Sequence, residues 1–150
     1  MTNSAHIVFG NVNEMTALAD LLNLKFKTPT HIPFLLNRFK NKNVKSFNHA
    51  KWFMAGSTFI MTQGSVAPAI IVWGNGESAE VPPYAPISPV RDTTGAGDAL
   101  VAGFLASLLN DKDPKTCLDW GCKVASEVVT NIGATLSNDF IAQFLNNHHA

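Results

Sequence analysis

Residues 92–100 have residue types and a spacing that could carry out a reaction. The tripeptide Gly95-Ala96-Gly97 precedes Asp98, and a long apolar run follows. If a helix begins here, its first backbone N–H groups have no partner within the helix and can bind an anion, which the helix dipole also favours. Asp98 in the first turn can accept a proton from a substrate hydroxyl. The pattern predicts an oxyanion hole beside a general base, as phosphoryl transfer to an alcohol requires.

Two other glycine-rich motifs do not fit this stretch. The dinucleotide-binding fingerprint would need glycine at Leu100, and the P-loop would need a Gly-Lys-Ser/Thr sequence that is absent. A structural alternative stays open, in which the glycines only make a tight turn. Asp98 would then only stabilise the N-terminus of the helix through its interaction with the helix dipole.

Short apolar segments and amphipathic segments alternate along the chain and must position these residues. Strands are predicted at residues 6–10, 59–62 and 69–73, with a returning strand at 78–81 after the turn signal Gly74-Asn75-Gly76. Helices are predicted from Asn11 to Leu22, around residues 35–39, from the glycines at 95–97 to Leu109, from Asp113 to about Ile132, and from Ser137 onward. Gly133 is expected to stop the fourth of these helices. Strands alternating with helices predict an α/β protein, and the length fits one domain over residues 1–150.

Three stretches resemble a known family. Residues 92–109 resemble the C-terminal signature of the ribokinase-like, phosphofructokinase B family of sugar and nucleoside kinases. Residues 9–14, Phe-Gly-Asn-Val-Asn-Glu, resemble its Asn-x-x-Glu motif, which supports magnesium and phosphate. Residues 61–64, Met-Thr-Gln-Gly, resemble the strand-end turn that lies along ATP. These forms, together with residues 121–135, are most similar to those of adenosine kinases.

The resemblance implies a three-layer α/β fold with a parallel sheet, flanking helices and one hairpin. It also implies a reaction: ATP-dependent phosphorylation of the 5′-hydroxyl of adenosine, giving AMP and ADP for purine salvage. The resemblance implies Asp98 as the catalytic base, together with Gly95, Ala96 and Gly97. It implies that ATP is bound by Thr62, Gly64, Asp92, Thr94, Gly95 and Gly97. It implies that Mg²⁺ is held through water by Asn11 and Glu14. The strand ends at Asn11 and at residues 62–64 are then expected to face residues 95–98.

Alternatives remain at single residues and for the acceptor. Asn11 followed by Glu14 is also a helix capping box, which needs no metal. Adenosine kinases commonly have Asn where Thr94 stands, whereas sugar kinases of the family often have Thr, so ribose and other sugars stay open as acceptors.

The resemblance begins at the strand before Asn11 and does not include the N-terminal half of the family's fold, which holds the sugar ring of the acceptor. The chain is therefore expected to correspond to the C-terminal, ATP-binding half and to be inactive alone. A hypothesis of another class is a non-catalytic nucleotide-binding relic of a kinase.

Composition narrows the class of partner. The 150 residues carry 11 basic and 11 acidic side chains, and this balance argues against a nucleic-acid or membrane-surface binder. The carboxylates are unevenly placed, since none falls between Leu21 and Gly76, where seven basic residues lie. That basic segment could meet phosphates or could be a solvated face.

Location and association can also be predicted. No run of 18 apolar residues suggests a transmembrane helix, and residues 1–6 lack the pattern of a secretory signal. The two cysteines, Cys117 and Cys122, cannot make a disulfide framework and are expected to pack in a reducing compartment. A cytoplasmic protein with a small-molecule nucleoside substrate is expected, with the nucleus as a second location and the oligomeric state open.

Overall fold

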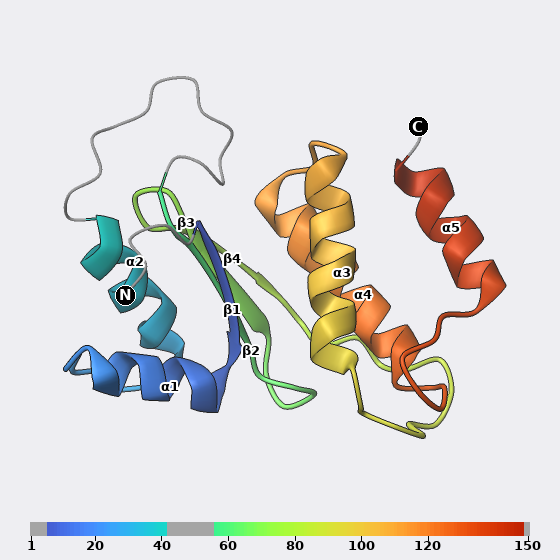
Figure 1. The fold of residues 1–150 in the computed structure, drawn as a ribbon, viewed down its shortest axis with the longest axis horizontal. Coiled ribbons are helices and arrows are strands. Elements are labelled where there is room, and N and C mark those ends of the chain that lie inside the picture. The colour runs from blue at the N-terminus through green and yellow to red at the C-terminus, as the bar shows by residue number, and fades with distance from the viewer. Residues whose placement is uncertain (1–5, 42–55, 149–150) are drawn as a thin grey trace. The chain divides into compact units, whose positions relative to one another are not determined.

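The computed structural model describes residues 6–41 and 56–148, which belong to two compact units, residues 1–82 and 83–150 (Figure 1). The first unit contains β1 (Ile7–Asn11), α1 (Val12–Leu21), the 3-10 helix η1 (Pro29–His31), α2 (Ile32–Asn41), β2 (Thr58–Thr62), β3 (Ala69–Trp73) and β4 (Glu77–Val81). The second unit contains α3 (Ala96–Leu109), α4 (Pro114–Val128) and α5 (Asn138–His148). The predicted α/β class is confirmed. Residues 41–51, whose polar sequence predicts an irregular segment, lie almost wholly outside the described residues.

The sheet of the first unit is mixed, with the strand order β1-β2-β3-β4. β1 and β2 are parallel, and Asn11 at the end of β1 pairs with Thr62 at the end of β2. β2 with β3 and β3 with β4 are antiparallel. The expected parallel strands at residues 6–10 and 59–62 and the expected hairpin of β3 and β4 are confirmed, while the antiparallel pairing of β2 with β3 makes the sheet mixed. Residues 63–68 are too few for the crossover that a parallel neighbour of β2 would need.

The turn between β3 and β4 forms where glycines were expected to place it. Gly74 and Gly76 have φ values of +52° and +102°, and the Gly76 N–H donates to Trp73 O at 3.0 Å. Residues with side chains rarely adopt such φ values, so the two glycines make the tight reversal possible.

α1 and α2 supply the apolar residues that cover one face of this sheet. Buried Met15 and Ala19 of α1 and Ile32 and Leu36 of α2 form a single cluster with side chains of the two central strands, Phe59, Met61, Ile70 and Val72. The strand residues alternate along the chain because successive side chains of a strand point to opposite faces. This packing fixes β1 and β2 and hence their carboxyl ends.

In the second unit, α3 and α4 approach closely because glycine stands at their contact. A Cβ atom added at Gly103 would lie 2.7 Å from Val124 Cγ2 and 2.9 Å from Trp120 O. One added at Gly121 would lie 2.8 Å from Leu100 O. Atoms approach that closely only where a side chain is lacking, so these two glycines set the position of α3 on α4.

α5 completes a small apolar core in the second unit. Its Phe140 and Phe144, with Leu136 before it, pack against buried Ala99 of α3 and Val124 and Val128 of α4. The Phe144 ring also meets the Trp120 ring edge-on, with 5.0 Å between centroids. The Phe140 N–H donates to Ser137 Oγ at 3.3 Å, which confirms Ser137 as the cap of this helix.

α4 begins at the predicted residue but ends earlier than predicted. Asp113 Oδ1 accepts from the Thr116 N–H at 3.1 Å, as an N-cap should, and Pro114 follows. The helix ends at Val128 instead of near Ile132. The Val129 carbonyl accepts from the N–H groups of Arg91 and Asp92, outside the helix, and so makes no bond to residue 133 that would continue it.

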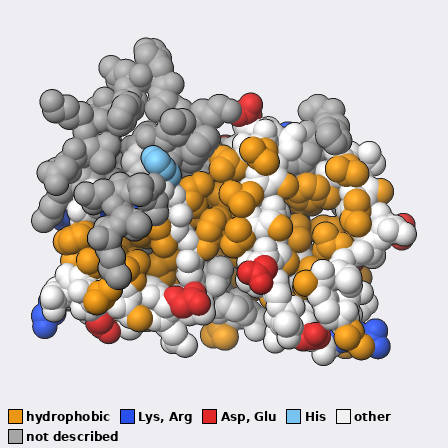
Figure 2. All heavy atoms as spheres, in the orientation of Figure 1, with side chains coloured by type: hydrophobic (Ala, Val, Ile, Leu, Met, Phe, Trp, Pro, Cys, Tyr) orange, Lys and Arg blue, Asp and Glu red, His pale blue; other side chains and the backbone are white. Residues whose placement is uncertain are grey.

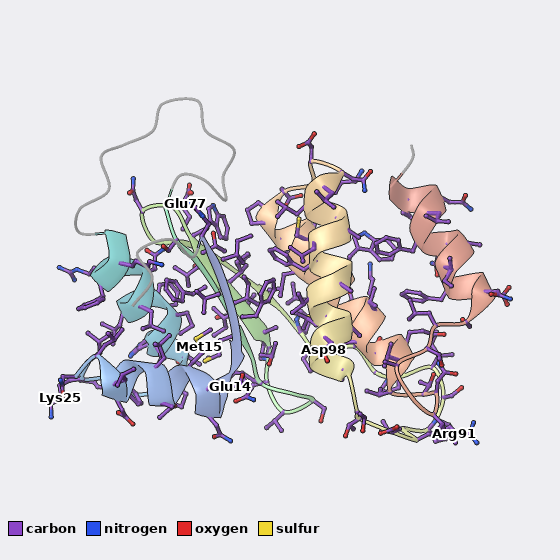
Figure 3. The ribbon with its side chains drawn as sticks, viewed as in Figure 1. Glu14, Met15, Lys25, Glu77, Arg91 and Asp98 are labelled. Carbon is purple, nitrogen blue, oxygen red and sulfur yellow. The ribbon has the colours of Figure 1, made fainter. Side chains whose placement is uncertain are left out.

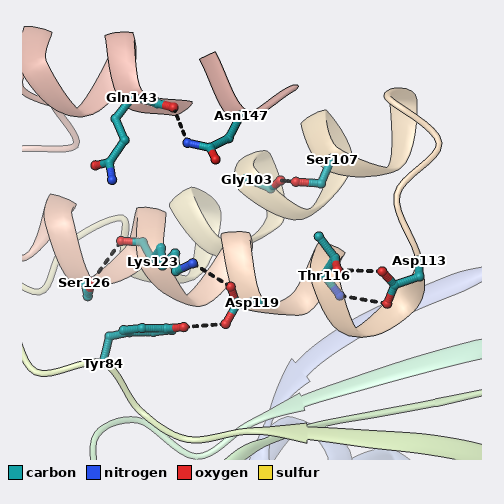
Figure 4. A network of polar contacts seen from close by, with 10 residues as sticks. All are labelled: Tyr84, Gly103, Ser107, Asp113, Thr116, Asp119, Lys123, Ser126, Gln143 and Asn147. Carbon is teal, nitrogen blue, oxygen red and sulfur yellow. Dashed lines mark hydrogen bonds and ion pairs between the residues drawn. The ribbon is translucent and has the colours of Figure 1, made fainter. Parts of the chain in front are cut away.

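Polar contacts along α4 tie the segment after β4 to this helix (Figure 4). The Tyr84 hydroxyl donates to Asp119, which also pairs with Lys123 Nζ at 2.7 Å. Lys123 Nζ in turn lies 4.6 Å from the Trp120 ring centroid and 5.5 Å from that of Tyr84. Burial and then the Asp119 contact raise the pKa of Tyr84 to about 12. Tyr84 is therefore a neutral anchor at physiological pH.

The two cysteines have no disulfide partner in the described part of the chain. Burial, with the nearby Asp113 and Asp119 respectively, raises the pKa of both Cys117 and Cys122 to about 12. A thiol with so high a pKa is a poor nucleophile, which agrees with a packing role.

Figure 2 shows apolar side chains on the visible surface over α3 and α5. Leu109 of α3 is 83% exposed, and Leu145 of α5 is 46% exposed.

None of the helices in the described residues is both long and apolar enough to cross a membrane.

Candidate active site

The turn that leads into α3 has an unusual backbone. Gly95 is the N-cap of the helix and adopts the left-handed conformation, with φ +78° and ψ 1°. The Ala96 N–H donates to Thr93 O at 3.2 Å, and the first helical bond runs from the Ala99 N–H to Gly95 O at 2.8 Å. The chain therefore reverses sharply at Gly95 and enters the helix at once.

This geometry leaves backbone donors unused in the first turn of α3. The N–H groups of Gly97 and Asp98 have no hydrogen-bond partner among the described residues, and both residues are exposed. The Ala96 N–H, in contrast, is engaged with Thr93, so Ala96 shapes the turn without offering a free donor. Free N–H groups at the positive end of a helix dipole suit an anion such as a phosphoryl group.

Asp98 lies at the N-terminal end of α3 with its side chain exposed (Figure 3). It belongs to the first turn of the helix, and its carboxylate accepts no hydrogen bond from any described residue. A carboxylate free of protein partners and next to two free N–H donors has the chemistry of a general base beside an anion site.

A second turn, at the end of α4, packs against this one. A Cβ atom added at Gly95 would lie 2.9 Å from Ala134 Cβ. Asp92 Oδ1 accepts from the Thr94 N–H at 2.9 Å, and Asp92 Oδ2 accepts from the Gly133 N–H at 3.2 Å. These hydrogen bonds, from Thr94 first, hold the pKa of Asp92 below its usual range. Gly133 and Ala134 thus contact the turn before α3, a partnership that neither the predicted helix stop at Gly133 nor the resemblance of residues 121–135 indicated.

In the first unit, the residues expected near magnesium form a capping box. Glu14 Oε2 accepts from the Asn11 N–H at 2.8 Å, and Asn11 Oδ1 accepts from the Glu14 N–H at 3.0 Å. Both side chains are exposed. Gly10 stands close to them, because a Cβ atom added there would lie 3.4 Å from Glu14 Oε2. The box uses one oxygen of each side chain, and Glu14 Oε1 has no partner among the described residues.

The other predicted residues of this unit lie at the end of β2. Thr62 is paired with Asn11 in the parallel register, so both stand at the same edge of the sheet. Gly64 follows with φ +61° and is exposed, and a Cβ atom there would meet nothing within 4 Å. The Gln63 side chain closes the loop, since its Nε2 donates to Pro68 O at 2.6 Å. Ligands bind at such strand ends in open α/β sheets.

The predicted residues thus gather in two places, one in each unit. Asn11, Glu14, Thr62 and Gly64 share one sheet edge, and residues 92–98 share the turn before α3. The expectation that these two places face each other concerns separately described units and stays a prediction. No group of three or more His, Cys, Asp or Glu side chains in the described ranges could hold a metal directly.

The chain is similar to proteins of known activity over part of their length. It is 34% identical over 79 residues to adenosine kinase 2 of Arabidopsis thaliana, a match that covers 52% of this chain and 22% of that protein. It is 37% identical over 76 residues to acarbose 7(IV)-phosphotransferase of an Actinoplanes species, a match that covers 51% of this chain and 25% of that protein. The matched segments therefore span about a quarter of these relatives.

Solved structures agree over most of the chain. Anopheles gambiae adenosine kinase, in complex with P1,P4-di(adenosine-5) tetraphosphate, has a TM-score of 0.67 at 30% identity, covering 85% of this chain and 35% of that one. Ribokinase of Thermotoga maritima has the same TM-score at 22% identity, covering 95% and 42%, and supports the ribokinase-like fold alone. The resemblance to adenosine kinase-like proteins is thus confirmed. The family profile described as pfkB family carbohydrate kinase matches residues 1–141, so the chain belongs to the pfkB family.

Proposed function

We propose that this chain supplies the ATP-binding and phosphoryl-transfer part of a kinase that phosphorylates the 5′-hydroxyl of adenosine, giving AMP and ADP in purine salvage. The observation that carries the proposal is the first turn of α3. Two free N–H donors, of Gly97 and Asp98, stand there beside the exposed Asp98 carboxylate. Membership of a kinase family gives this turn its reaction class.

Asp98 acts as the general base. It accepts the proton of the 5′-hydroxyl while that oxygen bonds to the γ-phosphorus of ATP and ADP departs with the electrons of the broken P–O bond. The N–H groups of Gly97 and Asp98 donate to the phosphoryl oxygens, on which negative charge lies during transfer. Gly95 makes this possible because its left-handed conformation starts the helix without a capping side chain.

Asn11 and Glu14 fit an indirect role at magnesium. Their exposed side chains keep one carboxylate oxygen, Glu14 Oε1, without a described partner, and the capping box fixes its position. A carboxylate in that state can accept a hydrogen bond from metal-bound water. Bound Mg²⁺ would neutralise charge on the phosphates of ATP. Thr62 and Gly64, which stand at the same sheet edge, would contact the nucleotide. Thr94, which belongs to the turn before α3, would also contact it.

A sugar acceptor is the second candidate, and two observations favour it. The family profile is that of carbohydrate kinases, and the relative from Actinoplanes is as similar to this chain as the adenosine kinase of Arabidopsis thaliana. Thr94 agrees with the form that is frequent in sugar kinases. The hypothesis of another class, a non-catalytic nucleotide-binding relic of a kinase, is tested by the same experiment.

The test is phosphorylation of labelled adenosine and labelled ribose by the full-length gene product with Mg-ATP. We expect labelled AMP at a higher kcat/KM than ribose 5-phosphate. 5′-Deoxyadenosine, which lacks the acceptor hydroxyl, is the control and should compete without being phosphorylated. Preference for ribose would establish the sugar kinase. Binding of ATP without transfer to either acceptor would establish the relic.

The same assay on these 150 residues alone should show no phosphorylation of adenosine and weak binding of ATP. The reason is that the resemblance places the groups that hold the acceptor ring in the part of the family's fold that this chain does not match. Efficient turnover by these 150 residues would show that the groups that hold the acceptor lie within this chain.

A further inference from the structure

The Asp92 carboxylate joins two segments that are far apart in sequence. Its Oδ1 accepts from the Thr94 N–H, two residues away, and its Oδ2 accepts from the Gly133 N–H, 41 residues away. Both oxygens are therefore engaged with backbone donors. One of these donors belongs to the turn before α3 and the other to the segment that follows α4.

Further contacts run between the same two segments. The N–H groups of Arg91 and Asp92 both donate to Val129 O, at 2.8 and 3.3 Å. Gly95 packs so closely on Ala134 that a Cβ atom at Gly95 would lie 2.9 Å from Ala134 Cβ. The Asp92 bonds thus lie between two other contacts and complete a continuous seam along the turn.

The segment after α4 is itself held in place. Asn131 Nδ2 donates to Glu127 O at 3.2 Å and to Thr135 O at 3.3 Å, which bridges the two ends of this turn. The Ser137 hydroxyl donates to Glu127 Oε1 at 2.6 Å. These bonds hold the position of the segment that carries the Gly133 N–H. The hydrogen bond from this N–H to Asp92 therefore restrains the Asp92 side chain.

Simple chemistry argues against contact between Asp92 and the phosphate groups of a nucleotide. An ionised carboxylate and a phosphate group both only accept hydrogen bonds, and both are negative. The hydrogen bonds from Thr94 and Gly133 lower the pKa of Asp92, so the group stays ionised at neutral pH and would repel a phosphate that touched it. The free donors are further along the turn, at Gly97 and Asp98.

We propose that Asp92 is a positioning residue, whose carboxylate holds residues 93–98 on the turn after α4 so that the Gly97 and Asp98 N–H groups meet the transferred phosphoryl group. This inference rests on the proposed function. In this role Asp92 would act on bound ATP through the turn, without contact to its phosphate groups. Catalysis depends on it because a displacement of about 1 Å at reacting groups can cost roughly 100-fold in rate.

Asp92→Asn tests the proposal with little change in shape. Its amide has one acceptor oxygen and an NH₂ group that cannot accept, so at least one of the two bonds is lost, and a bond that remains goes to a neutral oxygen and is weaker. Asp113→Asn is the matched control, because Asp113 also accepts from a backbone N–H but caps α4, away from the turn. Both variants are made in the full-length gene product, labelled with ¹⁵N-glycine to observe Gly133 and Gly97.

In Asp92→Asn we expect the Gly133 amide to exchange its hydrogen about 10- to 100-fold faster, as loss of a bond to a charged group implies. The Gly97 shift caused by Mg-ATP should shrink. kcat should fall about 10- to 100-fold, while KM for ATP changes less than about 3-fold, which is the pattern for an interaction that matters in the transition state. Asp113→Asn should lower Tm and leave the Gly97 shift and kcat unchanged.

Other results would overturn the proposal. A higher KM for ATP with unchanged kcat would show direct contact with the nucleotide. Loss of Tm alone, as in Asp113→Asn, would show a merely structural role. If the unmodified protein phosphorylates neither adenosine nor ribose, the proposed function fails. In that case Gly133 exchange and the Gly97 shift with inorganic phosphate still decide whether Asp92 positions the turn.

Discussion

The first turns of α1 and α3 differ in what satisfies their backbone N–H groups. At α1, Asn11 and Glu14 satisfy each other's backbone through a reciprocal pair of hydrogen bonds. At α3, Gly95 has no side chain to cap the helix, and Asp98 in the first turn bonds to no described residue. At α1, two backbone N–H groups are therefore bonded to side chains, whereas α3 has no side-chain cap and keeps the Asp98 carboxylate free beside its open donors.

The difference indicates a division of roles between the two places. A capping box stabilises a helix end and fixes its side chains. An uncapped end loses that stabilisation, which amounts to about 1 kcal/mol for a typical cap. In the second unit, α4 and α5 are capped by Asp113 and Ser137. Among its described helices, α3 is the one that lacks a side-chain cap. The uncapped helix is the one whose sequence matches the family signature.

Asp98→Asn breaks the α3 side of the comparison and should have the largest effect. Without the base, kcat should fall about 100- to 10,000-fold, while ATP still binds, because the base acts on the acceptor hydroxyl. The measurement is AMP formation by the full-length gene product together with ATP binding by calorimetry. Asp139→Asn, which removes an acid from the first turn of α5, is the control and should keep normal turnover. Equal turnover of Asp98→Asn and the parent would exclude Asp98 as the base.

Glu14→Gln tests whether the α1 end does more than cap its helix. Gln can keep the bond from the Asn11 N–H, so Tm should hardly change, while the charge is lost. If Glu14 bonds to metal-bound water, half-maximal activity should need about 10-fold more Mg²⁺. A magnesium titration of the full-length gene product measures this. Asp20→Asn removes an exposed charge elsewhere on α1 and controls for net charge.

An unchanged magnesium titration in Glu14→Gln would leave Glu14 as a helix cap alone. The comparison would then become simpler, with all the chemistry on the α3 side.

What the sequence could predict follows from how local each interaction is. The capping box joins residues three apart, and Asp113 caps α4 over the same distance, so both could be recognised from residue spacing. The turn at Gly74 and Gly76 depends on two backbone conformations within three residues. In each case, the residues that make the feature lie within three positions of each other in the sequence.

The features that were missed depend on distant partners. The early end of α4 results from Arg91 and Asp92 donating to Val129, and the bond from Gly133 to Asp92 spans 41 residues. β3 pairs with β2 in the antiparallel direction, as the short loop between them requires for neighbouring strands. The sequence alone does not show that these two strands are neighbours. Asp92 could be identified as part of a signature, but its partner at Gly133 could be found only in the folded chain.

Gly95→Ala tests why the α3 end is uncapped. Alanine at φ +78° is strained by about 1–2 kcal/mol, and its Cβ would lie 2.9 Å from Ala134 Cβ. We expect the free energy of unfolding to fall by at least about 1 kcal/mol, measured by urea denaturation. Gly97→Ala is the matched control, because its φ is not positive and a Cβ atom there meets nothing within 4 Å. Similar stability of the Gly95→Ala and parent proteins would show that the turn needs no glycine.

The smallest effect should come from pH, and it concerns the two carboxylates of the second unit that accept hydrogen bonds from the backbone, Asp92 and Asp113. Hydrogen bonds from Thr94 and then Gly133 lower the pKa of Asp92. Burial alone would raise the pKa of Asp113, but its bonds from Thr116 outweigh this and lower it. A lowered folded-state pKa adds stability that is complete above the unfolded value, near 3.9, and is lost as the pH falls through the folded value. Tm should therefore drop below about pH 4.

Variants assign that drop in Tm to particular side chains. In Asp92→Asn and Asp113→Asn, Tm at pH 7 should be lower than in the parent and should decline less between pH 5 and pH 2.5, because the group that titrates is gone. If neither variant declined less than the parent in this range, the hydrogen bonds that Asp92 and Asp113 accept from the backbone would not account for the acid sensitivity of the fold.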